Sequence, residues 1–392
     1  MKVLMINSVC GIRSTGRICT DLALELKKQG HEVKIAYGRE KVPDPFKDLA
    51  IRIGNKFDNY ISALKARVSD NEGFNCTKAT EKFLSWAEQY NPDILWLHNL
   101  HGYYINVELL FAWIKNRPDM QVKWTLHDCW AFTGHCAHFS AVGCERWKVY
   151  CTNCPQSRIY PVAYRDNCKN NYNRKKAAFS GVTKMTLITP SQWLADLVQE
   201  SFLKMYPVEV IYNTIDTNVF KPVPSDFRER FQLNDKKIIL GVASVWNERK
   251  GLQDFYTLSG MLSDKYTIVL VGLTKKQLRN LPQNIIGITR TNNVKELAEI
   301  YTVADVFVNL TYEDTFPTVN IEALSCGTPV ITYRTGGSPE CLDAECGSVV
   351  ECGDIRTIKK KIELVCSEKP YSVAACLNRA VLFDKNRKGE EK

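Results

Sequence analysis

Short apolar runs rich in β-branched residues alternate with longer amphipathic stretches along the whole chain. In the first half, the apolar runs are bounded by polar or glycine-containing turns and predict strands at residues 2–9, 32–37, 93–98, 122–127 and 185–189. The amphipathic stretches predict helices, at residues 16–29 and around 106–115. Continuous apolar strands that alternate with helices are typical of a parallel sheet covered on both faces, so we expect an α/β domain here.

The second half repeats this rhythm, with predicted strands at residues 237–242, 266–272, 284–288, 306–310 and 328–333 and helices at 252–262, 294–301 and 317–325. Residues 213–224, between the halves, are polar and contain prolines, which indicates a linker. The pattern therefore predicts an α/β protein with two doubly wound, Rossmann-like domains that face a central cleft. We expect these domains at residues 1–219 and 220–375, followed by a short tail at 376–392.

Length and composition fit this architecture. The 392 residues suffice for two domains that each bury a core, and 45% hydrophobic and 24% charged residues are globular values. The apolar stretch after Lys2 is too short for a signal peptide, and no run approaches the roughly 20 apolar residues of a membrane span, so we expect a cytoplasmic protein. In that reducing compartment, fifteen cysteines are expected to be thiols or metal ligands rather than disulfides.

Residues 311–322 carry the most informative chemistry. They follow the predicted strand at 306–310, and open parallel sheets bind ligands at the carboxyl ends of their strands. Amides at the start of the next helix favour a phosphate, and Glu322 could accept hydrogen bonds from the hydroxyls of a ribose. Either Glu313 or Asp314 could reach the hydroxyls of a sugar beyond a diphosphate. The alternative is an ordinary scaffold unit of a doubly wound domain.

Residues 313–340 resemble the Glu-x7-Glu region and the following Gly-Gly-x-Pro-Glu of retaining GT-B glycosyltransferases of the family-4 type, in the variant that begins Glu-Asp-x-Phe-Pro. The glycine loop at 11–16, the linker at 213–220 and the pair Lys250-Gly251 follow the order of that family. The resemblance implies a GT-B fold with an N-terminal acceptor-binding domain and a C-terminal domain that binds a nucleotide-sugar donor. It also implies retention of the anomeric configuration, by a same-face substitution in which the leaving phosphate helps to deprotonate the acceptor.

Positive charge is needed near the departing diphosphate, because negative charge grows on the leaving oxygen in the transition state. Lys250, after the predicted strand at 237–242, is the favoured candidate, with Arg249 beside it; an exposed lysine at a helix start is the alternative. Many family members have an arginine six positions before this lysine, where the present chain has Ser244. The resemblance implies that catalysis uses no cofactor or divalent metal.

The loop at residues 11–16 lacks the Gly-x-Gly-x-x-Gly spacing, which argues against a dinucleotide cofactor. It could bring backbone amides and polar side chains to the N-terminus of the helix from Gly16, or be a plain turn. With the resemblance, the expected donor-binding residues are Gly16, Arg13, Ser14, Arg249, Lys250, Phe316, Pro317, Thr318, Val319 and Glu322.

Histidines follow two predicted strands. His127 and Asp128 end the strand at 122–127, and a histidine there could bind the donor sugar or orient the acceptor. His98 and His101 come after the strand at 93–98 and, with Asp128, are expected on the acceptor side. Buried structural histidines are the alternative. The expected catalytic residues are His127, Lys250, Asp314 and Glu313.

A cysteine cluster lies at residues 129–154, an insert in the first domain. The spacing of Cys136, Cys144, Cys151 and Cys154 predicts a tetrahedral structural zinc site, with free thiols or reversible disulfides as the alternative. A similar insert occurs in a subset of the family, in exopolysaccharide and colanic-acid-type enzymes, and its implied role is to shape the acceptor pocket. The basic residues at 165–176 then predict either a helix face toward anionic lipid or a solvated basic helix.

The resulting hypothesis is a cytoplasmic glycosyltransferase of surface polysaccharide or lipopolysaccharide biosynthesis. A peripheral location on the inner face of the cytoplasmic membrane is the alternative location. Its partners would be a nucleoside diphosphate sugar and a saccharide or lipid-linked acceptor. Nucleotide-sugar epimerisation on the same fold is one alternative. A zinc-stabilised nucleic-acid-binding protein is another, suggested by the net charge of +9, but the basic residues are dispersed along the chain and we expect no nucleic-acid partner.

Overall fold

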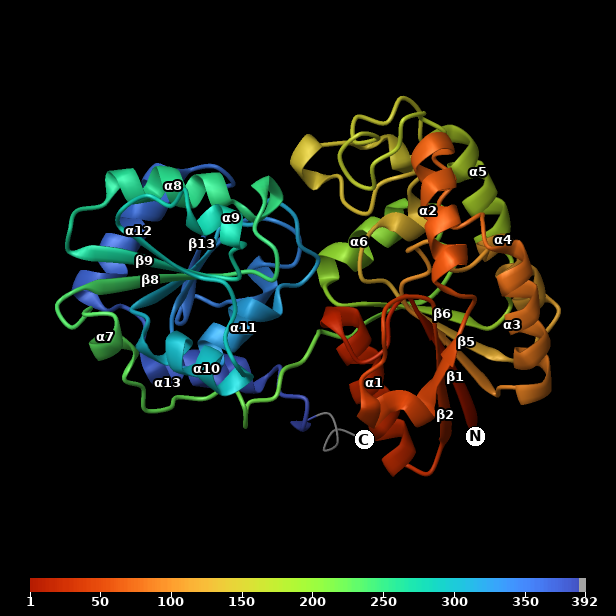
Figure 1. Ribbon diagram of the computed structural model, residues 1–392, viewed down its shortest axis with the longest axis horizontal. Helices are drawn as coiled ribbons and strands as arrows, with labels where there is room; N and C mark the ends of the chain where they lie inside the picture. Colours follow the sequence, from red (N-terminus) through yellow and green to blue (C-terminus); the bar gives the residue numbers. More distant parts are fainter. Residues whose placement is uncertain (388–392) are drawn as a thin grey trace. The chain divides into compact units, whose positions relative to one another are not determined.

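The computed structural model describes residues 1–387 and divides into two compact units, Met1–Ile211 and a second that begins at Tyr212 (Figure 1). Each unit is a parallel sheet packed with helices, which confirms the predicted α/β class with two doubly wound domains. The division lies before the polar stretch at 213–224, so this stretch belongs to the second unit.

The sheet of the first unit has seven strands in the order β3-β2-β1-β4-β5-β6-β7. All neighbours are parallel; the strands are β1 (Lys2–Asn7), β2 (Glu32–Tyr37), β3 (Ala50–Arg52), β4 (Ile94–Leu97), β5 (Gln121–Thr125), β6 (Met185–Thr189) and β7 (Val208–Val210). Strand order reverses between β1 and β4. The loops that follow these two strands therefore meet at a topological switch point, where doubly wound sheets bind ligands.

The first unit contains six α-helices: α1 (Arg13–Lys28), α2 (Lys56–Ser69), α3 (Thr77–Tyr90), α4 (Val107–Lys115), α5 (Cys168–Phe179) and α6 (Gln192–Glu200). The chain enters α1 earlier than predicted, because the helix starts at Arg13 and not at Gly16. Gly16 is buried in the first turn, where a Cβ atom would lie 3.0 Å from Cγ2 of Val9. The predicted glycine loop is therefore shorter, and its second glycine serves helix packing.

Residues 129–167, called the insert from here on, connect β5 to α5. They contain the short 3-10 turns η2 (Trp130–Phe132), η3 (Ser140–Val142) and η4 (Arg146–Lys148). The rings of Phe132, Phe139 and Trp147 pack together, with 4.9 Å between the centroids of Phe139 and Trp147. The insert therefore has an aromatic core that continues into the core of the first unit.

The second unit has a six-stranded parallel sheet in the order β10-β9-β8-β11-β12-β13. Its strands are β8 (Lys237–Val242), β9 (Tyr266–Val271), β10 (Ile285–Ile288), β11 (Val306–Asn309), β12 (Val330–Tyr333) and β13 (Gly347–Val350). Its helices are α7 (Phe227–Arg230), α8 (Leu252–Met261), α9 (Lys275–Leu278), α10 (Val294–Val303), α11 (Thr318–Ser325), α12 (Ile355–Glu368) and α13 (Val373–Val381). The order reverses between β8 and β11, so this unit also has a switch point.

The end of the described chain is tied to the start of the second unit. Ile215 and Asp384 form a parallel bridge, and the amide of Ile215 donates to the carbonyl of Phe383 at 3.0 Å. Helix α13 packs against α11. Because α13 runs to Val381, the first residues of the predicted tail at 376–392 are helical. Residues 388–392 of that tail lie outside the described part. Through residue 387, the helices all fall short of the length and apolar character that crossing a bilayer requires.

Candidate functional site

The switch point of the second unit brings together the residues predicted to contact a diphosphate. After β8 the chain forms the 3-10 turn η5 (Glu248–Lys250), and after β11 it forms the loop that leads into α11. Because β8 and β11 are neighbours in the sheet, the two loops lie side by side. The amide of Tyr312 donates to the carbonyl of Arg249 at 2.9 Å, which joins the loops directly.

An ion pair joins the predicted cation to one of the two predicted carboxylates. Nζ of Lys250 lies 2.6 Å from Oδ2 of Asp314, and both side chains are partly buried. Glu313 is only 6% exposed, and its carbonyl accepts a hydrogen bond from Nη1 of Arg249 at 3.2 Å. Of the two neighbouring carboxylates, Asp314 is therefore the one beside Lys250.

Two glycines allow the loops to approach this closely. Gly251 has φ +71°, and a Cβ atom there would lie 2.1 Å from the carbonyl oxygen of Leu310. Gly336 has φ +49°, and its Cβ would lie 1.6 Å from the carbonyl oxygen of Asp314. Neither space can hold a side chain, and both backbones adopt the left-handed region that glycine tolerates. These glycines fix the positions of Lys250 and Asp314.

Glu322, in the second turn of α11, is held by two hydroxyls. Oη of Tyr301 donates to its Oε2 at 3.0 Å, and Oγ1 of Thr318 lies 3.4 Å from its Oε1. Burial and the Glu322 carboxylate raise the pKa of Tyr301 well above its ordinary value, so the phenol stays protonated. Pro317 occupies the N-cap and offers no side-chain acceptor to the helix amides, which leaves this end suited to an anion. Phe316 is buried beneath the loop, and Val319 is half-buried in the first turn.

In the first unit, two histidines stack at the ends of neighbouring strands. Nδ1 of His98 lies 3.0 Å from Nε2 of His127, and the ring centroids are 5.3 Å apart. Burial lowers the pKa of both rings, that of His127 to about 4, so both are neutral at neutral pH. One ring donates to the other, which fixes the orientation of His127.

A second histidine pairs with the carboxylate that follows His127. Nε2 of His101 lies 2.8 Å from Oδ2 of Asp128, and the amide of Trp130 donates to Oδ1 of Asp128 at 2.9 Å. Burial alone would lower the pKa of His101, but the Asp128 carboxylate outweighs it and raises that pKa. Burial would likewise raise the pKa of Asp128, and the His101 imidazolium lowers it. Each of the two groups therefore favours the charged form of the other.

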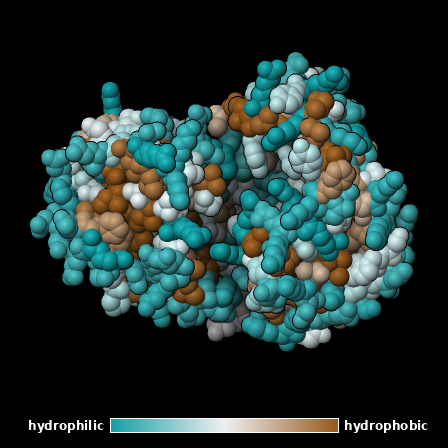
Figure 2. Space-filling view, in the orientation of Figure 1, coloured by the Kyte–Doolittle hydropathy of each residue, from teal (hydrophilic) through white to brown (hydrophobic). Residues whose placement is uncertain are grey.

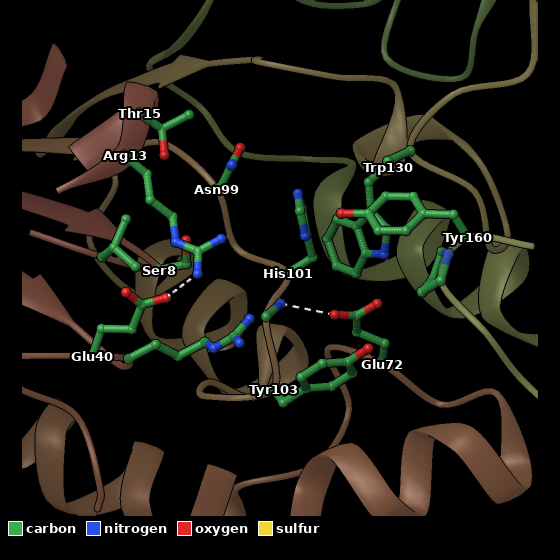
Figure 3. Close-up of a pocket in the computed structure, with 15 residues that line it drawn as sticks. Ser8, Arg13, Thr15, Glu40, Glu72, Asn99, His101, Tyr103, Trp130 and Tyr160 are labelled. Carbon is green, nitrogen blue, oxygen red and sulfur yellow. Dashed lines mark hydrogen bonds and ion pairs between the residues drawn. The ribbon is translucent and has the colours of Figure 1, made fainter. Parts of the chain in front are cut away.

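A cavity of about 380 Å³ opens beside this pair at the switch point of the first unit (Figure 3). Its lining comes from the loops after β1, β2, β4 and α2, from α1 and from the insert. The lining residues are Ser8, Val9, Arg13, Thr15, Arg39, Glu40, Glu72, Asn99, His101, Gly102, Tyr103, Trp130, Ala137, Tyr160 and Pro161. Figure 3 shows aromatic rings on one side and the Arg13–Glu40 pair, at 2.5 Å, on the other. Aromatic faces combined with charged and amide groups suit a sugar ring.

The cavity changes the interpretation of the glycine loop. Arg13 lines this cavity, whereas Ser14 points to solvent and Gly16 is buried in α1. Glu72, Tyr103 and Tyr160 were missed from the sequence because they come from loops without a recognisable pattern. Glu72 accepts a hydrogen bond from the amide of Gly102 at 2.8 Å, which fixes the backbone next to His101.

The structure does not show the predicted zinc site. Over residues 1–387, no group of three or more His, Cys, Asp or Glu side chains is arranged to hold a metal ion. Cys136 and Cys151 are buried against the aromatic core of the insert, and Cys144 and Cys154 pack at its edge. A hydrogen bond from Cys136 lowers the pKa of Cys154 to about 7, and burial raises that of Cys151 to about 11. Cys136 and Cys151 thus fill the interior of the insert, and all four cysteines are outside disulfides.

Two of the five basic side chains in the stretch at 165–176 are engaged within the first unit, while Arg165, Lys169 and Lys176 are exposed. Lys175 is buried, and its Nζ donates to the carbonyls of Trp130 at 2.7 Å and Thr133 at 3.1 Å. Arg174 is engaged by a bidentate pair with Glu108. Burial lowers the pKa of Lys175 to about 7. This lysine therefore anchors the insert to α5.

Two family models match the chain. Residues 225–378 match "Glycosyl transferases group 1", and residues 15–219, which are 205 of the 392 residues, match "Glycosyltransferase Family 4".

Among curated proteins, the putative colanic acid biosynthesis glycosyl transferase WcaC of Escherichia coli is 28% identical over 269 residues, 66% of this chain and 64% of that protein. The alpha-galactosylglucosyldiacylglycerol synthase of Streptococcus pneumoniae is 27% identical over 40% of this chain and 46% of that protein. The chain thus spans less than two thirds of these relatives.

Solved structures share the fold over almost the whole chain. Sucrose-phosphate synthase from Thermosynechococcus elongatus superposes with a TM-score of 0.72 at 17% identity, covering 98% of this chain and 95% of that one. HepE from Anabaena in complex with UDP gives a TM-score of 0.65 at 15% identity, covering 98% and 96%. These likenesses confirm the predicted GT-B fold.

Proposed function

Because the chain belongs to the group 1 glycosyltransferases, with an N-terminal part of the family-4 type, we propose that it transfers a sugar from a nucleoside diphosphate sugar to a saccharide or lipid-linked saccharide. We further propose that transfer retains the anomeric configuration and serves surface polysaccharide or lipopolysaccharide biosynthesis in the cytoplasm. The likeness to WcaC, which is named for colanic acid biosynthesis, supports this context.

The observation that carries the proposal is the Lys250–Asp314 pair beside the start of α11. A donor diphosphate at this end of the helix would accept hydrogen bonds from its amides and pair with Lys250. As the bond to the sugar breaks, negative charge grows on the diphosphate, and both groups stabilise it. In the free protein the Lys250 ammonium pairs with the Asp314 carboxylate. In the complex this ammonium is then available to the leaving diphosphate.

The carboxylates take separate roles in this proposal. Asp314, beside Lys250, accepts hydrogen bonds from hydroxyls of the donor sugar, while Glu313 is too deeply buried to do so. Glu322, oriented by Tyr301 and Thr318, accepts from the hydroxyls of the ribose.

The cavity of the first unit is the proposed acceptor site. Its aromatic rings would stack on a sugar ring, and the His101–Asp128 pair and Arg39 would bind hydroxyl or anionic groups. His127, held neutral beside His98, would orient the acceptor hydroxyl. An epimerase needs no acceptor site and a nucleic-acid-binding protein needs no donor site, so this combination favours transfer over both alternatives.

The test is a panel of nucleoside diphosphate sugars, scored by release of the nucleoside diphosphate with and without candidate saccharide acceptors. We expect release with one donor and a strong increase with the right acceptor. Asp314→Asn should reduce turnover far more than the neighbouring control Glu313→Gln. A panel in which every donor is left intact, or in which a donor is converted equally well without acceptor, would refute the proposal.

A further inference from the structure

Three residues that line the cavity of the first unit have strained backbones. Arg13 has φ +57°, Glu40 +65° and Tyr103 +67°. These angles lie in the left-handed region, which is unfavourable for residues that carry a Cβ atom. Strain of this kind collects at sites where side chains are held in place for a ligand. The backbone therefore marks this cavity as a built site.

Most charged groups around this cavity have a partner of opposite charge. Nη2 of Arg13, whose side chain is largely exposed, lies 2.5 Å from Oε1 of Glu40. Nε2 of His101 lies 2.8 Å from Oδ2 of Asp128, and each of these two groups favours the charged form of the other. Neither pair therefore gives the cavity a net charge.

Glu72 is the other carboxylate of the lining, and its charge is offset from within the protein. It is only 8% exposed, and its Oε1 accepts a hydrogen bond from the amide of Gly102 at 2.8 Å. Burial lowers the pKa of Lys175, and the Glu72 carboxylate is the largest of the effects that raise it. Because an amide and a nearby ammonium both interact with this carboxylate, Glu72 does not make the cavity acidic.

Arg39 is a charged residue of the lining that lacks such a partner. Within residues 1–387 its guanidinium forms no ion pair with a carboxylate. The side chain is half-buried next to Tyr103, whose ring centroid lies 5.9 Å from Cζ, and next to Gly102, where a Cβ atom would lie 3.5 Å from Cδ. Charges on the open surface, where Figure 2 shows mostly hydrophilic residues, are solvated and screened. The Arg39 charge is partly withdrawn from water, so it attracts an anion more strongly.

The rest of the lining suits the neutral part of a sugar. Ser8, Thr15 and Asn99 bring two hydroxyls and an amide, and Trp130 and Tyr160 bring aromatic rings on the other side (Figure 3). Hydroxyls and amides exchange hydrogen bonds with sugar hydroxyls, and aromatic faces pack on the apolar face of a sugar ring. The volume of about 380 Å³ lies in the range of small-ligand sites. The cavity thus combines a saccharide surface with one unbalanced positive charge.

We propose that this cavity takes an acidic acceptor, a sugar unit that carries a carboxylate or a phosphate, and that Arg39 selects it. The inference rests on the proposed function, because it assigns the acceptor of that transfer. A guanidinium is a planar set of donors that can bind a carboxylate or a phosphate through two parallel hydrogen bonds. A neutral acceptor would bury the Arg39 charge further without giving it a partner, which costs binding free energy.

The test is a ligand-observed NMR titration of the full chain with methyl glycosides that differ only at C6. Each series contains the neutral hexoside, the corresponding uronic acid and the 6-phosphate, in the gluco, galacto and manno configurations. We expect that in at least one series an acidic form binds about tenfold or more tightly than the neutral form, because it gains a hydrogen bond between charged groups. The tighter of the two acidic forms shows whether the natural anion is a carboxylate or a phosphate.

Variants of Arg39 separate its charge from its shape. Arg39→Gln should remove the preference for the acidic form and keep the melting temperature of the wild type, because the guanidinium has no carboxylate partner to lose. Arg39→Lys keeps the charge without the planar set of donors, so it should retain part of the preference. Arg17→Gln, at an exposed arginine of α1 outside the lining, is the matched control and should bind like the wild type.

Three outcomes would overturn the selection of an acidic acceptor. These are equal binding of acidic and neutral forms, an acidic preference that Arg39→Gln retains in full, or no binding in any series. Binding is measured without a nucleotide sugar, so it is independent of transfer. An Arg39-dependent preference without any reaction of a nucleotide sugar refutes only the proposed function, while transfer to a neutral saccharide that is equally fast in Arg39→Gln and wild type refutes only this inference.

Discussion

The phenol of Tyr301 donates a hydrogen bond to the carboxylate of Glu322, with 3.0 Å between Oη and Oε2. Tyr301 is fully buried in α10, and Glu322 lies at the rim of the proposed donor site in α11. A buried tyrosine thus sets the rotamer of a partly exposed carboxylate. The proposed contact with the ribose depends on this arrangement.

Removing the hydroxyl in Tyr301→Phe should therefore weaken binding of the nucleoside diphosphate about tenfold, because the carboxylate loses a hydrogen bond to a charged group. Isothermal titration calorimetry with the product nucleotide measures this change. Tyr206→Phe is the control, since Oη of Tyr206 donates to a backbone carbonyl at 2.7 Å in the first unit. Equal nucleotide affinity in both variants would show that Tyr301 has only a structural role.

Lys250→Ala should lower kcat by about 10²- to 10³-fold, the usual loss when one preorganised group that stabilises developing charge is removed. The KM for the donor should change less, because the growing charge is a property of the transition state. Lys275→Ala, at an exposed lysine of α9, is the control for the loss of one surface charge. A Lys250→Ala enzyme with an unchanged kcat would remove this lysine from the mechanism.

The His101–Asp128 pair should make stability depend on pH. The raised pKa of His101 contributes stability that is complete below its ordinary value of 6.5 and is lost as pH rises through the folded value. The lowered pKa of Asp128 contributes stability that is lost as pH falls below 3.8. Melting temperatures of wild type and His101→Gln should therefore differ most between these values and converge in alkaline solution.

Lys175 should have the opposite effect on the pH dependence of stability, so that its contribution to the free energy of unfolding increases as the pH rises. Its pKa is lowered to about 7 in the folded chain, against 10.5 as its ordinary value, so the unfolded chain binds the extra proton between these pH values. The free energy of unfolding of the wild type, compared with Lys175→Met, should rise between pH 7 and 10. Urea titrations measure it, and Lys176→Met, at the exposed neighbour, should show no such trend. A flat difference across this range would mean that Lys175 stays charged inside the protein.

Strands were predicted well because a strand buried on both faces is a continuous apolar run. The predictions for β2, β6 and β8 coincide with the structure. Helix α2 was not predicted, although Phe57, Tyr60, Leu64 and Val68 recur at helical spacing. The sequence does not reveal that this apolar stripe faces outward and that the buried side chains of the helix are small. The insert likewise lacks a helical or strand period. Its cysteine spacing predicts a metal site that the structure does not show, and Cys136 and Cys151 pack among aromatic rings.

In the candidate site, side chains near a motif were predictable and their partners were not. Lys250 and Asp314 follow neighbouring strands of one sheet, so the sequence pattern brings them together. Tyr301 belongs to the apolar face of α10 and is indistinguishable by sequence from an ordinary core residue. Arg13 lines the cavity of the first unit, a position that the sequence could not reveal because the side-chain direction depends on where α1 begins.

The close contact between Gly336 and the carbonyl of Asp314 limits how the proposed donor site can change. A Cβ atom at position 336 would lie 1.6 Å from the carbonyl oxygen of Asp314. Every other amino acid there would therefore displace the Asp314 backbone and disturb its pairing with Lys250. Libraries selected for any nucleotide sugar should thus retain glycine there. New donor preferences would have to arise from side chains that point into the site, while the backbone that carries Asp314 stays the same.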